Sequence, residues 1–131
     1  MKYNEVKWGL DSIGCVSDIV GKTPIKIETD NDDYIFMQFS DNTICRFYHE
    51  QDCCENVTID DINGDWDDLL GNPILVSDAR VSDGPNEDEY DSNTWTFYTF
   101  RGIGGSVDVR WHGSSNGYYS ESVDFQMQAA K

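Results

Sequence analysis

Basic residues are scarce in this chain, and their scarcity excludes several classes of partner. The 131 residues include 9 Lys and Arg against 25 Asp and Glu, a formal net charge of −16. Between Phe47 and Phe100, Arg80 is the single Lys or Arg among fourteen acids. Nucleic acids are bound through Lys and Arg that displace phosphate counterions, and anionic membrane surfaces repel an acidic protein. The composition therefore argues against direct binding to nucleic acids or membranes.

Long hydrophobic runs are also missing. No stretch approaches the roughly 20 apolar residues that a membrane-spanning helix requires, and residues 1–16 lack the apolar core and cleavage site of a signal peptide. We therefore expect the protein in the cytoplasm of a host cell. In that compartment cysteines are expected as thiols, and two adjacent cysteines are poorly placed for a disulfide. The four cysteines are Cys15, Cys45, Cys53 and Cys54.

Aromatic residues, in contrast, are abundant at 13% of the chain, which argues against disorder despite the charge. The length predicts a single domain spanning residues 1–131. A net charge of this size destabilises a compact state through self-repulsion. We therefore expect the charge to serve a function, and a basic protein surface is the partner that it would attract.

Apolar periodicity predicts mostly strands. A short helix is predicted to end at Gly21, and single helical turns are expected within residues 49–55 and 65–70. Residues 82–93 read as a long loop. The predicted class is α+β and β-rich: a curled or barrel-like antiparallel sheet of about seven strands with one or two short helices. Strand patterns lie at residues 24–29, 33–40, 43–48, 56–62, 73–81, 94–101, 106–111 and 118–127.

The segment between Tyr48 and Glu55 carries the strongest local signal for a binding site. On a helical turn His49 and Cys53 would share a face, and thiolate with neutral imidazole is a ligand set that zinc prefers. We therefore predict a structural zinc ion, and the alternative is a pair of small buried cysteines beside a core histidine. The predicted ligands are His49, Cys53, Cys54 and Asp52, with Cys45, His112, a distant carboxylate or water as other candidates for the fourth position.

Motifs for catalysis are lacking. The chain has neither the H-x-E and P-C-x-x-C pattern of zinc deaminases nor a G-x-S-x-G elbow. The acidic run from Asp60 to Asp68 fails as an EF-hand because its first and twelfth ligand positions would be Ile59 and Leu70. We therefore expect a protein that is not an enzyme. A small zinc-dependent enzyme using His49, Cys53 and Cys54 is the alternative.

Three blocks of sequence resemble a family of small phage-encoded domains of unknown function. They are YHEQDCCE at residues 48–55, IDDI with the following Gly64 and Asp65, and SNGYYSESVDF at residues 115–125. The resemblance implies an origin in a phage or mobile element. It also implies that His49, Cys53 and Cys54 ligate a metal, with Asp52 and Glu55 as acidic neighbours. In size and charge the chain is similar to anti-CRISPR proteins, several of which are acidic mimics of nucleic acid.

The leading functional hypothesis is an inhibitor whose carboxylates occupy a basic groove of a host protein that handles nucleic acid. A Cas9-type effector is the first candidate, because its guide and target channels are strongly positive. An accessory phage protein without an inhibitory role is a further alternative. The predicted contact residues are Asp60, Asp61, Asp65, Asp67, Asp68, Glu87, Asp88, Glu89 and Asp91.

Overall fold

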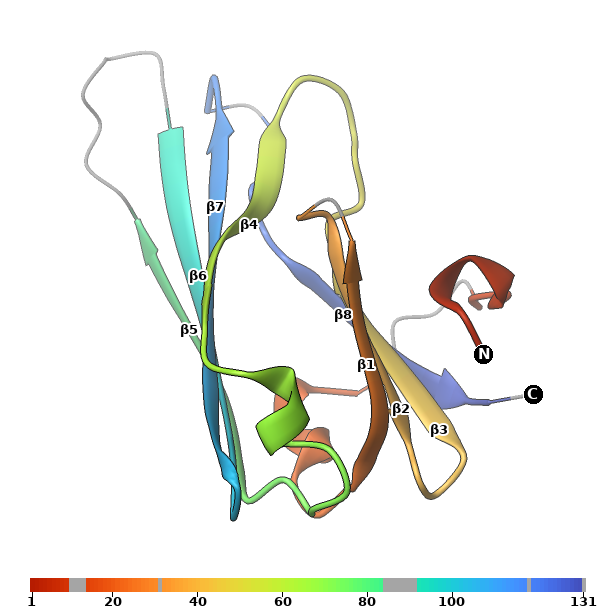
Figure 1. Ribbon diagram of the computed structural model, residues 1–131. Helices are drawn as coiled ribbons and strands as arrows, with labels where there is room; N and C mark the ends of the chain where they lie inside the picture. The colour runs from red at the N-terminus through yellow and green to blue at the C-terminus, as the bar shows by residue number, and fades with distance from the viewer. Residues whose placement is uncertain (10–13, 31, 84–91, 118, 131) are drawn as a thin grey trace.

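The computed structural model describes residues 1–9, 14–30, 32–83, 92–117 and 119–130. These residues form a sandwich of two four-stranded antiparallel sheets that face one another (Figure 1). Sheet A has the strand order β1-β2-β3-β8, and sheet B has the order β4-β7-β6-β5. Each sheet contains strands that are distant in sequence, so the chain crosses between the two layers.

Sheet A contains β1 (Pro24–Asp30), β2 (Tyr34–Phe39), β3 (Thr43–Tyr48) and β8 (Asp124–Ala129). A tight turn joins β2 to β3, and Asn42 adopts a positive φ of 68° there. Asparagine tolerates this left-handed conformation better than most residues, so the hairpin appears where the sequence predicts it. The strand β8 returns from the end of the chain to pair with β3.

Sheet B contains β4 (Asn56–Asn63), β5 (Val76–Asp83), β6 (Ser92–Gly102) and β7 (Gly105–Ser115). The strand β6 lies inside the sheet, as its continuous run of apolar and aromatic residues predicts. The strands β4 and β5 form the two edges (Figure 1). A register shift between Ile59 and Asp61 bends β4 against β7.

The predicted α+β class is wrong, because the helical segments are short 3₁₀ turns. These are η1 (Tyr3–Glu5), η2 (Val16–Ile19) and η3 (Trp66–Asp68). Of the helix predicted to end at Gly21 only η2 forms among the described residues, where it buries the single side chain of Ile19. Residues 49–55 form no helical turn.

The prediction of a curled or barrel-like sheet is also wrong. The described strands form two separate sheets, with no pairing that closes them into a barrel. The physical reason is that both sheets present an apolar face, and two such faces bury one another without a continuous ladder of hydrogen bonds.

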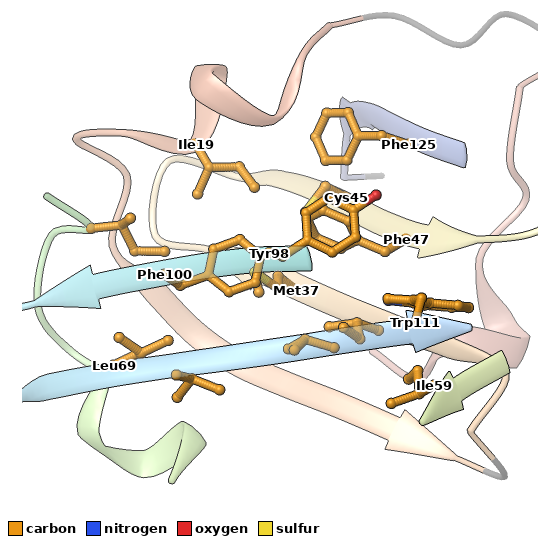
Figure 2. Packing of buried hydrophobic residues seen from close by; sticks show 14 of the residues in the cluster. Ile19, Met37, Cys45, Phe47, Ile59, Leu69, Tyr98, Phe100, Trp111 and Phe125 are labelled. Atoms are coloured by element: carbon orange, nitrogen blue, oxygen red, sulfur yellow. The ribbon is translucent and has the colours of Figure 1, made fainter. Parts of the chain in front are cut away.

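The main core lies between the two sheets. Phe47 on β3 packs against Tyr98 and Phe100 on β6, with ring centroids 4.9 and 5.5 Å apart. Phe125 on β8 lies 5.0 Å from the same Phe47 ring. Figure 2 shows the side chains of Phe47 and Tyr98 lying together, one from the yellow strand of sheet A and the other from the cyan strand of sheet B. Phe47 therefore joins the two layers.

A second, smaller cluster lies on the opposite face of sheet A. Phe36 and Ile44 are buried there at 0% and 1% exposure, although they point away from the main core. The N-terminal segment covers them: Tyr3 stacks on Tyr34 at 3.8 Å, and Trp8 packs edge-on against Phe36. Arg46 lies over the Trp8 ring at 4.6 Å. Residues 1–9 thus supply the outer cover of sheet A.

The two ends of the predicted loop at residues 82–93 belong to sheet B, because β5 continues through Asp83 and β6 begins at Ser92, and residues 84–91 of that loop lie outside the described residues. The predicted contact residues Glu87, Asp88, Glu89 and Asp91 lie outside the described residues. No helix in the described part of the chain is long and apolar enough to cross a membrane.

Candidate functional site

The YHEQDCCE segment lies where the chain crosses from sheet A to sheet B. His49 follows the last residue of β3, and Glu55 precedes the first residue of β4. The start of β8 and the residues before it lie against the same segment, because the Ser122 carbonyl contacts the His49 ring and Asp124 accepts a hydrogen bond from the Glu50 N–H at 2.9 Å. Three elements from both sheets therefore meet at this crossing.

Glu55 organises the crossing as a hydrogen-bond acceptor. Its Oε1 accepts the Cys53 N–H at 2.9 Å and the Gln51 Nε2 amide at 3.1 Å. Its Oε2 accepts the Asp52 N–H at 3.0 Å and lies 2.8 Å from His49 Nε2. The side chain is 0% exposed. Four donors thus converge on one buried carboxylate and hold residues 49–55 in a tight turn.

The hydrogen bonds also set the charge of Glu55. Burial by itself raises the pKa of this carboxyl group, because it penalises the ionised form. The hydrogen bonds from the Cys53 N–H, the His49 ring and the Asp52 N–H favour the ionised form and outweigh burial, so that the pKa falls to about 2. Glu55 is therefore a carboxylate at neutral pH.

His49 lies between two acceptors. Its Nδ1 donates to the Ser122 carbonyl oxygen at 2.7 Å, and its Nε2 donates to the Glu55 carboxylate at 2.8 Å. Both bonds exist together only when both ring nitrogens carry a proton. The ring is 4% exposed, and through these two contacts it links the residues before β8 to the start of β4.

This arrangement does not fit a tetrahedral zinc site. A doubly protonated imidazole has no lone pair for a metal, and neutral His49 would have to give up Glu55 or Ser122 to become a ligand. No group of three or more metal-ligating side chains occurs among the described residues. Zinc binding through His49, Cys53, Cys54 and Asp52 stays a prediction, and it requires this segment to rearrange.

The cysteines differ from the expectation of four thiols. Cys53 and Cys54 are bonded to one another in the turn that Glu55 closes, while Cys15 and Cys45 are free. Cys45 is buried in the main core, and burial raises the pKa of its thiol. His112 lies on the outer face of sheet B, where its Nε2 contacts the Asn93 side-chain oxygen at 3.0 Å. Neither Cys45 nor His112 lies at the crossing.

Five of the predicted contact residues do lie together along one border of the molecule. Asp60 and Asp61 are on the edge strand β4, and Asp65, Asp67 and Asp68 form and precede η3. We call these five exposed carboxylates the acidic edge. Their one ion pair with a described residue joins Asp60 to Arg110, whose Nε lies 2.8 Å from the Asp60 oxygen.

One carboxylate of the acidic edge, that of Asp65, also stabilises the local fold. Asp65 accepts the Asp67 N–H at 3.0 Å and so caps η3. The side chains of Asp61, Asp67 and Asp68 make no hydrogen bond or ion pair with another described residue. They form the part of the acidic edge that is open to a partner.

The sequence analysis assigns Glu121 no role, although among the described acids it is the most buried after Glu55, at 7% exposure. Its partners are hydroxyl groups of Ser92, Thr94 and Ser115. Nothing in the local sequence separates Glu121 from the other acids of the chain, because its burial depends on strands that are distant in sequence.

Comparison with known proteins gives a family and nothing more specific. Residues 17–125 match the family described as "Domain of unknown function (DUF7448)". No curated protein and no solved structure matches the chain significantly.

Proposed function

Because this chain belongs to the DUF7448 family, whose function is unknown, we propose a role from its own residues: it is a non-enzymatic acidic protein that binds a basic surface of a host protein. The partner is one that handles nucleic acid, since such proteins carry extended positive grooves. The carboxylates of this chain take the place of phosphates in that groove.

The acidic edge is the observation that carries the proposal. Its five carboxylates are exposed along β4 and η3, and Arg110 neutralises only Asp60. The whole chain carries a net charge of −16, so its field would draw in and orient a positive partner over a distance. A solvated surface needs far less charge than this for solubility.

A Cas9-type effector is the first partner to test, because it holds its guide and target in strongly positive channels. On this proposal the chain originates in a phage or other mobile element and acts as an anti-CRISPR protein. The inhibitor would compete with nucleic acid for the channel without doing chemistry.

The test is a DNA-cleavage assay with effector, guide and target at fixed salt and increasing amounts of the full chain. The acidic edge is probed by the triple variant D61N/D67N/D68N, which spares the Arg110 partner Asp60 and the helix cap Asp65. The matched control is E5Q/D30N/D78N, which removes three exposed charges elsewhere. We expect the wild type and the control to inhibit cleavage, and the acidic-edge variant to need at least about tenfold more protein.

Raising the salt concentration supplies an independent arm of the same test. Inhibition that rests on exposed charges weakens steeply between about 0.1 and 0.5 M salt. No inhibition at large excess would remove the Cas9-type partner. Equal potency of the two triple variants would remove the acidic edge as the contact surface, whatever the partner is.

A further inference from the structure

A groove opens between the two sheets along the inner side of β5. Its volume is about 500 Å³. The inner-face residue Val81 pairs with Thr96, which is buried against the core, yet Val81 itself is 68% exposed. In a sandwich the inward side chains of both sheets are normally covered, so sheet A leaves this part of sheet B bare. The apolar lining comprises Val16, Ala79, Val81, Tyr98, Val123 and Phe125.

A buried carboxylate lines the same groove. Glu121 is 7% exposed and accepts hydrogen bonds from Thr94 Oγ1 at 2.8 Å, from Ser92 Oγ at 3.4 Å and from Ser115 Oγ. No ion pair of the described residues includes Glu121. Buried charges in proteins are normally paired with an opposite charge. Glu121 therefore differs from Glu55, which is also buried but faces His49.

A glycine on β7 allows Glu121 to lie close to sheet B. Gly113 on β7 lies between Val57 and Thr94 on the inner face. A Cβ atom at Gly113 would lie 2.7 Å from the Glu121 carbonyl oxygen and 2.8 Å from the Glu121 Cβ. The absence of a side chain at Gly113 thus allows the residues before β8 to press against the sheet and place the carboxylate at the groove.

We propose that this groove receives a lysine side chain of the basic partner, an inference that rests on the proposed function. The tetramethylene stem packs on the apolar walls of Val81, Val123 and Phe125, and the ammonium group pairs with Glu121. Lysine side chains commonly pack the methylene stem on apolar surface while the charged head stays clear of it. The exposed carboxylate of Asp83, which also lines the groove, attracts the same cation.

The hydroxyl groups around Glu121 favour lysine over arginine. Glu121 Oε1 already accepts from Thr94 and Ser92, and Oε2 accepts from Ser115. A guanidinium fork needs a free acceptor site on both oxygens in one plane. An ammonium group is a compact point charge that needs only one remaining lone pair. The site therefore offers a single-point contact at the end of an apolar channel.

The experiment titrates the isotope-labelled full chain with Nα-acetyl-L-lysine-N-methylamide and follows methyl and amide NMR signals. We expect saturable shifts that centre on Val16, Val81 and Val123. The norleucine analogue has the same stem without the charge, and the Nε-acetyl-lysine analogue has a neutral amide. Both should bind at least about tenfold more weakly, because they lack the charge-assisted contact.

Two variants and a matched control locate the binding. Glu121→Gln should weaken lysine binding at least about tenfold, whereas Asp78→Asn removes the same charge from the outer face of β5 and should change it by less than about twofold. Val81→Trp fills the groove from an exposed edge position and should abolish the shifts even if Glu121→Gln fails to fold.

Equal binding of the charged and neutral probes, or equal effects of Glu121→Gln and Asp78→Asn, would overturn the lysine site. Undiminished shifts in Val81→Trp would also overturn it. No effector takes part in this titration. A failure here with cleavage inhibition intact would refute the groove alone, and lysine binding without any inhibition would refute the choice of a Cas9-type partner alone.

Discussion

At the scale of single residues, Glu55 is the group on which the crossing between the sheets depends. It is 0% exposed and collects donors from Gln51, Asp52, Cys53 and His49. A buried acceptor that loses its charge or its geometry leaves these donors unpaired, which costs more than a lost surface contact. The stability of the segment should therefore follow the ionisation of one carboxyl group.

Glu55→Gln is predicted to lower the melting temperature at pH 7 and to change its pH dependence. The pKa of Glu55 is about 2 in the folded protein, below its ordinary value of 4.5. A lowered pKa contributes stability that is fully present above pH 4.5 and is lost as the pH falls toward 2. The difference in melting temperature between wild type and variant should therefore shrink across this window.

Thermal unfolding monitored by circular dichroism from pH 7 to pH 2 measures this difference. Glu50→Gln is the control, because Glu50 is the exposed neighbour in the same segment. A Glu55→Gln variant that melts with the wild type at pH 7, or a difference that stays constant down to pH 2, would contradict the proposed role of the carboxylate.

At the scale of secondary structure, local patterns predicted strands well and their arrangement poorly. The strand β3 begins and ends where alternation predicts, and the turn at Asn42 follows from its residue type. The pairing of β3 with β8 joins residues about 80 positions apart, for example Arg46 with Gln126. Such long-range pairing leaves no local periodicity, so a curled sheet and a sandwich looked alike from sequence.

For the candidate site as well, the residue types can be read from the sequence, but the conformation depends on long-range contacts. The block from Tyr48 to Glu55 carries the strongest local signal in the sequence, and its residue types predict a metal site, which stays a prediction. Its conformation depends on Ser122 and Asp124 from the far end of the chain. The Ser122 carbonyl and the Glu55 carboxylate contact the two nitrogens of the His49 ring, and a metal would have to displace one of them. Glu121 was overlooked for the same reason, since its hydroxyl partners lie on β6 and β7.

Packing of the residues before β8 against β7 gives a prediction at this scale. Gly113→Ala should destabilise the protein by about 1–3 kcal/mol, because overpacking a close contact forces backbone shifts of this cost. The new Cβ would meet the Glu121 backbone oxygen at 2.7 Å, and a backbone oxygen has no side-chain freedom with which to move away. Urea denaturation of wild type and variant measures the change in the free energy of unfolding.

Gly102→Ala in the same sheet is the matched control. The nearest atom to a Cβ at Gly102 would be the Pro73 carbonyl oxygen at 3.5 Å, which is an ordinary contact distance. Its effect should stay within about 0.5 kcal/mol. If the two variants were equally stable, the close approach of Glu121 to β7 would be wrong.

At the scale of the whole molecule, two apolar layers hold together against a net charge of −16. The contacts of Phe47 with Tyr98, Phe100 and Phe125 provide the attraction, while the carboxylates on the surface repel one another. The described residues contain few ion pairs that offset this repulsion, namely those of Asp41, Glu28, Glu55 and Asp60. Dissolved salt ions must therefore screen the remaining repulsion between the carboxylates.

The melting temperature is therefore predicted to rise with salt, by several degrees between about 0.01 and 0.15 M sodium chloride. The screening length falls from about 30 to about 8 Å over this range, so repulsion between distant carboxylates weakens. Differential scanning calorimetry measures the shift. The D61N/D67N/D68N variant, with three fewer charges, should melt higher at low salt and respond less. A melting temperature that falls or stays level would mean that attractive surface pairs dominate.

The cover over sheet A matters for anyone who expresses the domain on its own. The family match begins at residue 17, whereas Tyr3 and Trp8 lie upstream and pack on Tyr34 and Phe36. Trimming the chain to the matched region would leave Phe36 and Ile44 facing water next to one another on paired strands. An exposed apolar patch of that kind promotes association between protein molecules. The shortened protein would self-associate through sheet A, and its aggregation would be easily mistaken for natural oligomerisation.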